Sequence, residues 1–239
     1  MTSTSTGTET GQYRAAALRV TGLRRSFPHP GGDVDVLRGL ELSVRGGELV
    51  TVSGRSGSGK SSLLALLCGF DAPDSGTVLF DGEPIGADTP WTTCAVLPQA
   101  LGLAGELTIA ENVALPLRLR GGARSVDSTA VTARVNALLT ELRIDQLGDR
   151  YPLEVSFGQQ QRAALARAVA ARPTVLLTDE PTAHLDAGTT PAVLALLRRC
   201  ADEGAAVIVA THDAQVHRIA DRRVALKEGV LTESGPAVN

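Results

Sequence analysis

The fold of this chain is decided by one stretch, Gly54-Arg55-Ser56-Gly57-Ser58-Gly59-Lys60-Ser61. Apolar runs precede it at 49–52 and follow it at 63–67, so the pattern predicts a strand, a glycine-rich loop and the start of a helix. We expect its three glycines to take positive φ and to turn successive backbone N–H groups toward one concavity. The following helix points the positive end of its dipole at the same place, which suits a polyphosphate.

The side chains of this stretch indicate phosphate and metal binding. Lys60 is expected to reach the β- and γ-phosphates as a point charge, and the Ser61 hydroxyl to complete the shell of Mg²⁺. Among 23 basic residues only Lys60 and Lys227 are lysines, so a lysine at this position does not follow from composition. The expected nucleotide-binding residues here are Gly54, Ser56, Gly57, Ser58, Gly59, Lys60, Ser61 and Ser62.

The whole chain has 239 residues, a net charge of -3 and a pI near 5.8. This balance argues against a nucleic-acid surface. The three cysteines (Cys68, Cys94 and Cys200) are widely spaced, which predicts reduced thiols and neither a metal pair nor a disulfide framework. Residues 1–14 are typical of a disordered tail, and 15–239 of one domain. No window approaches the ~20 apolar residues of a membrane span, so at a membrane another protein would have to cross it.

Periodicity predicts an α/β fold. Short alternating apolar runs between 15 and 52 indicate antiparallel strands, with 76–82 and 92–97 as further short strands. A capping box at Thr108 and Glu111 begins a helix to about Leu119, and helices at 131–142 and 159–171 complete a helical insertion over about 100–165. Continuously apolar runs are typical of buried parallel strands, with helices on both faces. Those runs are 174–178 and 205–210, and the last strand-like segment is 224–226.

Polar residues follow the predicted buried strands, where open α/β sheets bind ligands. Asp179 is expected to hold Mg²⁺ through a water, and Glu180 to orient and deprotonate the attacking water. The alternative is that the pair caps a helix. His212 is placed to donate to a γ-phosphate, or is an ordinary half-buried histidine. Gln99 is a ligand of the metal or the attacking water, or equally a solvated turn residue.

These and further motifs follow one another along the chain: 54–61, Gln99, Val155-Ser156-Phe157-Gly158-Gln159, 175–180, Ala183-His184-Leu185-Asp186 and His212. In this order they resemble the Walker A, glutamine loop, signature, Walker B, D-loop and switch histidine of the ATP-binding subunit of an ABC transporter. The resemblance covers about Leu18 to Gly235. The segments 97–117 and Pro181-Thr182 look most like the lipoprotein-release and macrolide-export group.

The resemblance implies a P-loop NTPase (RecA-like) core, ATP and Mg²⁺ as ligands, and ATP hydrolysis. It implies a head-to-tail dimer, of two identical or two related subunits, that drives a separate permease from the cytoplasmic face of the membrane, with export as the expected direction. The signature of one subunit would cap the ATP of the other. The residues carried over to nucleotide binding are Phe27 beside adenine, Ser156, Gly158 and Gln159 of the signature, and Asp186 of the D-loop. Phe27 has an alternative role as a core aromatic.

Several positions depart from the family pattern. Phe157 stands where the signature has glycine; because a side chain disfavours positive φ, we expect the ring to point away from the phosphate of a working site. His184 is unusual in the D-loop, and Thr178 before Asp179 is expected to bond to backbone. Phe157 keeps open a regulatory ATP-binding module with weak hydrolysis. A non-transport ABC ATPase acting on nucleic acid or ribosomes is disfavoured, because no long coiled coil or second cassette is present.

Overall fold

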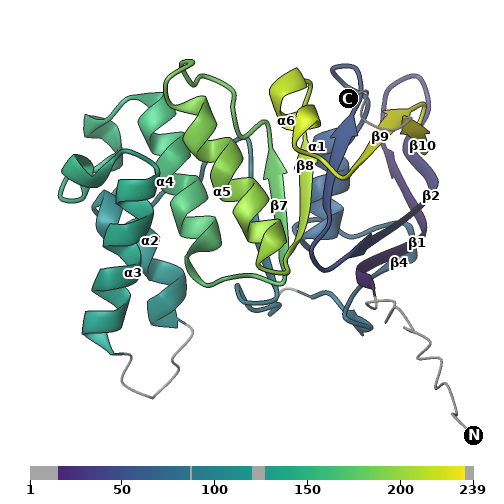
Figure 1. Ribbon diagram of the computed structural model, residues 1–239. Helices are drawn as coiled ribbons and strands as arrows, with labels where there is room; N and C mark the ends of the chain where they lie inside the picture. Colours follow the sequence, from purple (N-terminus) through teal and green to yellow (C-terminus); the bar gives the residue numbers. More distant parts are fainter. Residues whose placement is uncertain (1–15, 87, 120–126, 235–239) are drawn as a thin grey trace, which may run out of the picture.

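The computed structural model describes residues 16–86, 88–119 and 127–234, and they form two sheets flanked by helices (Figure 1). The first sheet is antiparallel, with strand order β2-β1-β4-β5. Its strands are β1 (Ala16–Phe27), β2 (Val34–Arg45), β4 (Ser75–Phe80) and β5 (Glu83–Pro84). The antiparallel subdomain expected from the alternating runs is confirmed.

The second sheet carries the glycine-rich loop and has the order β10-β9-β3-β8-β7-β6. All neighbours pair in parallel except the β9–β10 hairpin at one edge. The strands are β3 (Leu49–Ser53), β6 (Cys94–Leu97), β7 (Val175–Asp179), β8 (Ala206–Ala210), β9 (Arg222–Lys227) and β10 (Val230–Ser234). The mostly parallel sheet is therefore confirmed, and 224–226 is not the last strand, because β10 follows it.

Several helices begin at side-chain caps that the sequence supplies. Thr108 and Glu111 bond reciprocally at the start of α2, and Asp127 caps α3. Ser156 caps α4, which begins two residues before its expected start. The helices are α1 (Lys60–Leu67), α2 (Ile109–Leu119), α3 (Ser128–Glu141), α4 (Phe157–Ala170), α5 (Thr190–Asp202) and α6 (Ala214–Arg218), with 3₁₀ turns η1 (Asp145–Leu147) and η2 (Pro152–Glu154).

The parallel sheet is buried on both faces, as its continuously apolar strands require. In β8, Val207 and Val209 pack with the helical side, whereas Ala206 and Ile208 pack toward α1 and the antiparallel sheet. Helix α1 therefore lies between the two sheets, and α4 and α5 cover the other face. In Figure 1, α2, α3 and α4 gather on one side of the parallel sheet and β1, β2 and β4 on the other.

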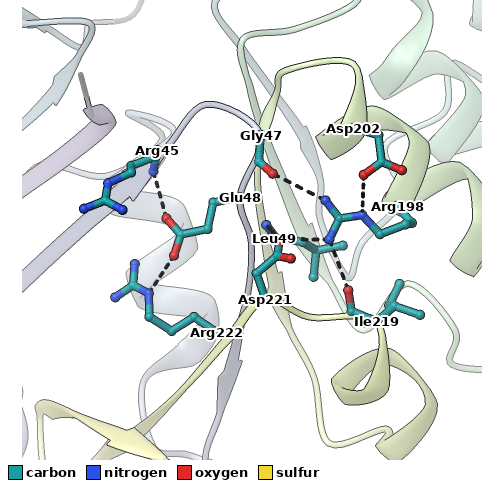
Figure 2. Close-up of polar contacts among 9 residues, drawn as sticks. All are labelled: Arg45, Gly47, Glu48, Leu49, Arg198, Asp202, Ile219, Asp221 and Arg222. Carbon is teal, nitrogen blue, oxygen red and sulfur yellow. Dashed lines mark hydrogen bonds and ion pairs between the residues drawn. The ribbon is translucent and has the colours of Figure 1, made fainter. Parts of the chain in front are cut away.

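A network of polar contacts closes the end of the parallel sheet where β3 begins (Figure 2). Asp221 Oδ2 accepts from the Leu49 backbone N–H at 2.7 Å and from Arg198 Nη1 at 2.8 Å. Arg198 also reaches Asp202 and the Gly47 carbonyl. Glu48 bonds the Arg45 N–H and Arg222 Nε. These contacts join α5 to the residues just before β3 and just before β9, and they fix where β3 starts.

The structure also bears on the predictions made for the cysteines and for Thr178. Cys68, Cys94 and Cys200 are free and partly buried, and burial raises the pKa of the Cys200 thiol to about 11, so it stays protonated. Thr178 is a correction: its hydroxyl is buried without a hydrogen-bond partner in the described chain, because the ladder of β7 already uses the neighbouring backbone groups. The expected tail at 1–14 lies outside the described residues.

Candidate nucleotide-binding site

The glycine-rich loop follows β3 and has the shape expected of it at two of its three glycines. Gly57 and Gly59 have φ of 77° and 98°. Gly54 does not take positive φ; it is required by space, since a Cβ there would lie 2.8 Å from the Leu226 carbonyl oxygen and 2.5 Å from Ser58 Oγ. The loop is thus a cradle. A side chain at Gly54 would collide with the protein itself, and the space that the loop leaves open is available to a ligand.

Helix α1 presents an open N-terminus to this cradle. Its N-cap residue, Gly59, has no side chain, so no cap accepts from the first N–H groups of the helix. Lys60 Nζ donates to the carbonyl of Gly54 at 2.9 Å and approaches that of Arg55 at 3.4 Å. A cation and free N–H donors at a helix N-terminus are the groups that bind phosphate oxygens. The residues present therefore fit a polyphosphate.

Ser61 and Asp179 come together across the site. Ser61 Oγ, in the first turn of α1, donates to Asp179 Oδ2 at the end of β7, with 2.7 Å between the oxygens. Burial raises the pKa of Asp179, although the Ser61 hydrogen bond opposes this shift. A hydroxyl and a desolvated carboxylate are oxygen ligands of the kind that Mg²⁺ takes beside phosphates. This pair fits the metal, because a divalent cation would offset the cost of keeping the carboxylate charged.

Glu180 is held at every polar group. Its backbone N–H donates to the Ala210 carbonyl at 2.8 Å, and its carboxylate accepts from Thr211 Oγ1 at 3.0 Å. His212 Nδ1 lies 2.7 Å from the other carboxylate oxygen. The side chain of Glu180 is 18% exposed, and that of His212 is 82% exposed. Two strand ends, β7 and β8, therefore aim a carboxylate and an imidazole at the same place.

A cavity of about 1020 Å³ opens over the loop, large enough for a nucleotide. It brings together most of the residues proposed from the sequence. They are Phe27, Gly54, Ser56, Gly57, Gly59, Lys60, Ser61, Ser62, Gln99, Asp179, Glu180 and His212. Phe27 is half-buried at the cavity wall, with the Arg25 guanidinium 4.7 Å from its ring centroid.

The other proposed residues do not line this cavity. Ser58 turns its hydroxyl inward, where it has no partner in the described chain. Ser156 and Gln159 bond each other as a capping box at the start of α4. The Asp186 carboxylate accepts from the N–H groups of Gly188 and Thr189, which lowers its pKa. Ser156, Gln159 and Asp186 could therefore contact a nucleotide only in the site of another subunit.

Phe157 is the first residue of α4 and is not among the residues with positive φ, so the signature does not need glycine here for its backbone. The cavity wall also includes His184 and Gln161, to which sequence reasoning gave no role in the chemistry. Gln161 is 4% exposed. Its spacing of four residues from Phe157 was the signal available, since it places both side chains on one face of α4.

Comparison with known proteins agrees with this geometry. The family model described as "ABC transporter" matches residues 37–183. The chain is 39% identical over 222 residues to a lipoprotein-releasing system ATP-binding protein, LolD 2, of Caulobacter vibrioides, covering 90% of this chain and 96% of that one. It is 35% identical over 230 residues to a methionine import ATP-binding protein, MetN, of Cupriavidus metallidurans, covering 93% of this chain but 66% of that one.

A solved structure shares the fold. It is the ATP-binding cassette MJ0796, a dimer in a post-hydrolysis state bound to ADP and Pi, with a TM-score of 0.86 and 28% identity. The match covers 93% of this chain and 99% of that chain. Among the described residues, none of the helices combines the length and the apolar character that crossing a membrane requires.

Proposed function

This chain belongs to the ABC transporter family and is an ATP-binding ATPase subunit, and we propose that it drives a separate membrane permease that exports its substrate. The observation that carries the proposal is the convergence of Lys60, Asp179, Glu180 and His212 on one cavity beside an open helix N-terminus. We place the subunit on the cytoplasmic face of the membrane, held there by its permease.

In the proposed mechanism Lys60 leaves the Gly54 carbonyl for the β- and γ-phosphates, whose oxygens offer a charge-assisted bond in its place. Ser61, and Asp179 through a water, would hold Mg²⁺, with Gln99 as a further ligand just after the end of β6. The metal supplies charge that offsets the charge of the phosphates during transfer. Phe27 stacks on the adenine. Each of these residues lines the cavity.

Glu180 is the proposed general base. Thr211 and His212 hold its carboxylate at the cavity, where a water attacking the terminal phosphate would lie within hydrogen-bond reach. His212 can contact that phosphate with its second ring nitrogen while Nδ1 faces Glu180. One 2.7 Å contact thus couples His212 to the proposed base.

A head-to-tail dimer is proposed because Ser156, Gly158, Gln159 and Asp186 do not reach their own subunit's cavity wall. Ser156 is exposed at the N-terminus of α4, a helix start suited to the terminal phosphate of ATP held by a partner subunit. Removing that phosphate by hydrolysis would remove the group that joins the subunits. Either two copies of this chain or this chain and a relative satisfy the arrangement.

The permease is proposed to dock in a second cavity, of about 480 Å³, between the Gln99 segment and α2. Trp91, Leu115 and Phe70 line it, and Phe70 is 72% exposed. A hollow with an exposed aromatic at its edge fits a short apolar segment of a partner. Because Pro98 lines both cavities, docking there touches the strand end that carries Gln99.

Export is supported by the 39% identity to a lipoprotein-releasing ATP-binding protein along 96% of its length. The methionine import relative makes uptake the opposing possibility. The permease, and not this subunit, determines which substrate is transported. Identifying the permease would therefore also decide the direction of transport.

The test uses the Glu180→Gln variant, which keeps the shape of the side chain but cannot take a proton. Steady-state ATPase activity should fall at least about 100-fold, the scale of a lost general base. Purified with ATP from mildly solubilised membranes, the same variant should retain its permease. A Phe70→Asp control should bind ATP equally and lose the permease. Recovery of ribosomes or DNA instead, or of no membrane protein, contradicts the transport proposal.

The regulatory alternative, motivated by Phe157, makes a different prediction. If hydrolysis is vestigial, wild type and Glu180→Gln have the same near-zero rate, and both bind ATP. The turnover assay therefore separates the two functions before any partner is identified.

A further inference from the structure

Helix α4 meets the turn after β7 through contacts made by its first two turns. Gln161 Nε2 donates to the Glu180 backbone carbonyl at 2.7 Å. The Phe157 and His184 rings meet edge to face, with centroids 4.9 Å apart and an interplanar angle of 83°. Between these contacts Gly158 packs so closely that a Cβ on it would lie 2.8 Å from the His184 carbonyl oxygen. The helix thus touches both ends of the turn 180–184.

This turn is in a conformation that its own residues do not favour. Glu180 and His184 have φ of 47° and 63°, in the left-handed region that residues other than glycine rarely adopt. The bond from the Ala183 N–H to the Glu180 carbonyl, 3.1 Å long, closes the turn but does not select this conformation alone. Strained residues persist where their surroundings hold them, and here the surroundings include the contacts with α4, beside those of the Glu180 carboxylate with Thr211 and His212.

Gln161 makes its contact at a cost. Its side chain is 4% exposed, and while Nε2 serves Glu180, Oε1 is buried without a partner in the described part of the chain. A buried acceptor left unpaired destabilises the folded state, so an apolar residue of the same length would serve stability better. The glutamine therefore needs an explanation other than stability.

We propose that Gln161 and Phe157 form a clamp on α4 that positions Glu180 for catalysis. The inference rests on the proposed role of Glu180 as general base. Gln161 fixes the backbone of Glu180 itself, and Phe157, four residues earlier on the same helix face, fixes the far end of the turn through His184. Phe157 replaces the signature glycine and serves this contact.

The first test is Gln161→Met, which keeps length, removes the unpaired acceptor and abolishes the bond to Glu180. We expect kcat to fall about tenfold, the scale of one lost hydrogen bond, with the KM for ATP unchanged. The unfolding midpoint of the apoprotein should stay the same or rise. A wild-type kcat overturns the proposal, and so does a parallel loss of kcat and stability, which is the signature of a merely structural residue.

The second test addresses the rings. Phe157→Gly and His184→Asn should each lower kcat about three- to tenfold, and the double variant no further, because both remove one contact. Asparagine tolerates left-handed φ, so His184→Asn removes the ring and keeps the backbone preference. Phe157→Tyr should restore wild-type kcat. Leu153→Ala, which truncates a side chain 93% exposed just before the signature, is the control expected to change nothing.

The outcomes separate this clamp from the proposed function. If Glu180→Gln abolishes turnover while all clamp variants match wild type, only the clamp is wrong. If Glu180→Gln retains turnover, the proposed base is wrong. A Phe157→Gly variant that is faster than wild type overturns the clamp, because it shows that the phenylalanine hinders the site.

Discussion

The two ends of the parallel sheet are built on opposite principles. At the end where β3 begins, charged groups are matched: Asp221 serves Leu49 and Arg198, and Glu48 serves Arg45 and Arg222 (Figure 2). At the end where β3, β7 and β8 finish, several buried polar atoms lack a partner among the described residues.

Of the four buried side-chain polar atoms without a partner in the described residues, three lie in or behind the site: Ser58 Oγ, Thr178 Oγ1 and Gln161 Oε1. Glu180 adds positive φ at the same end. Unpaired buried polar groups and strained backbone both cost stability, and proteins keep them where function requires them. The end of the sheet where β3 begins therefore stabilises the fold. The end at the site carries groups that lower stability and serve the chemistry.

The largest effect on this contrast should come from Gly59→Ala. The alanine would meet two obstacles, a φ of 98° and a Cβ position 2.6 Å from Val36 Cγ1. We expect a loss of about 3 kcal/mol in the free energy of unfolding without nucleotide, measured by denaturant titration.

The matched control for this change is Gly57→Ala. Its φ of 77° is also positive, but a Cβ there has nothing within 4 Å. Strain alone should then cost about 1 kcal/mol. Equal losses in the two variants would show that conformation, and not space, makes the loop demand glycine.

Much of the fold and part of the site followed from the sequence because they rest on local chemistry. The capping box at Thr108 and Glu111, the uninterrupted apolar strands and the glycine-rich loop each specify their own backbone. The order of the motifs along the chain, from 54–61 to His212, also indicated the family. The reason for Gly54 was only partly predictable, because one of the two obstacles, the carbonyl of Leu226, lies far along the chain.

Other features of the site depend on contacts between distant segments. Thr178 gave no sign that its hydroxyl would lack a partner, since hydroxyls in strands commonly bond to backbone. The pairing of Phe157 with His184 joins two departures from the family pattern that looked independent in sequence. The strand β10 was missed because its residues, Val230–Ser234, are half polar and carry the signal of an edge strand only.

The end of the sheet where β3 begins should show a smaller effect that leaves catalysis untouched. Asp221→Ala removes the acceptor of the Leu49 N–H and of Arg198. We expect a loss of about 1–2 kcal/mol in the free energy of unfolding, because a backbone donor loses its partner and Arg198 keeps only its contacts with Asp202 and with backbone carbonyls. The kcat and KM for ATP should stay within twofold of wild type.

Asp202→Ala provides the comparison for that variant. Asp202 bonds the same arginine, but its side chain is 64% exposed, so water replaces the lost contact. Its cost should be below about 0.5 kcal/mol. If Asp221→Ala also changed kcat, the two ends of the sheet would not be independent, and the contrast between them would fail.

The smallest expected effect has the opposite sign and lies at the end of the sheet at the site. Thr178→Val replaces an unpaired buried hydroxyl with a methyl group of nearly the same size. We expect a gain of about 0.5–1 kcal/mol in the free energy of unfolding, since the oxygen that is lost has no partner among the described residues. Thr211→Val is the matched contrast on the neighbouring strand end, because the Thr211 hydroxyl donates to Glu180 and accepts from the Asp213 N–H. It should lose stability and lower kcat together. If Thr178→Val instead destabilised the protein or slowed hydrolysis, the hydroxyl would have a partner during turnover. The unpaired groups at this end of the sheet would then be groups that contact the bound nucleotide.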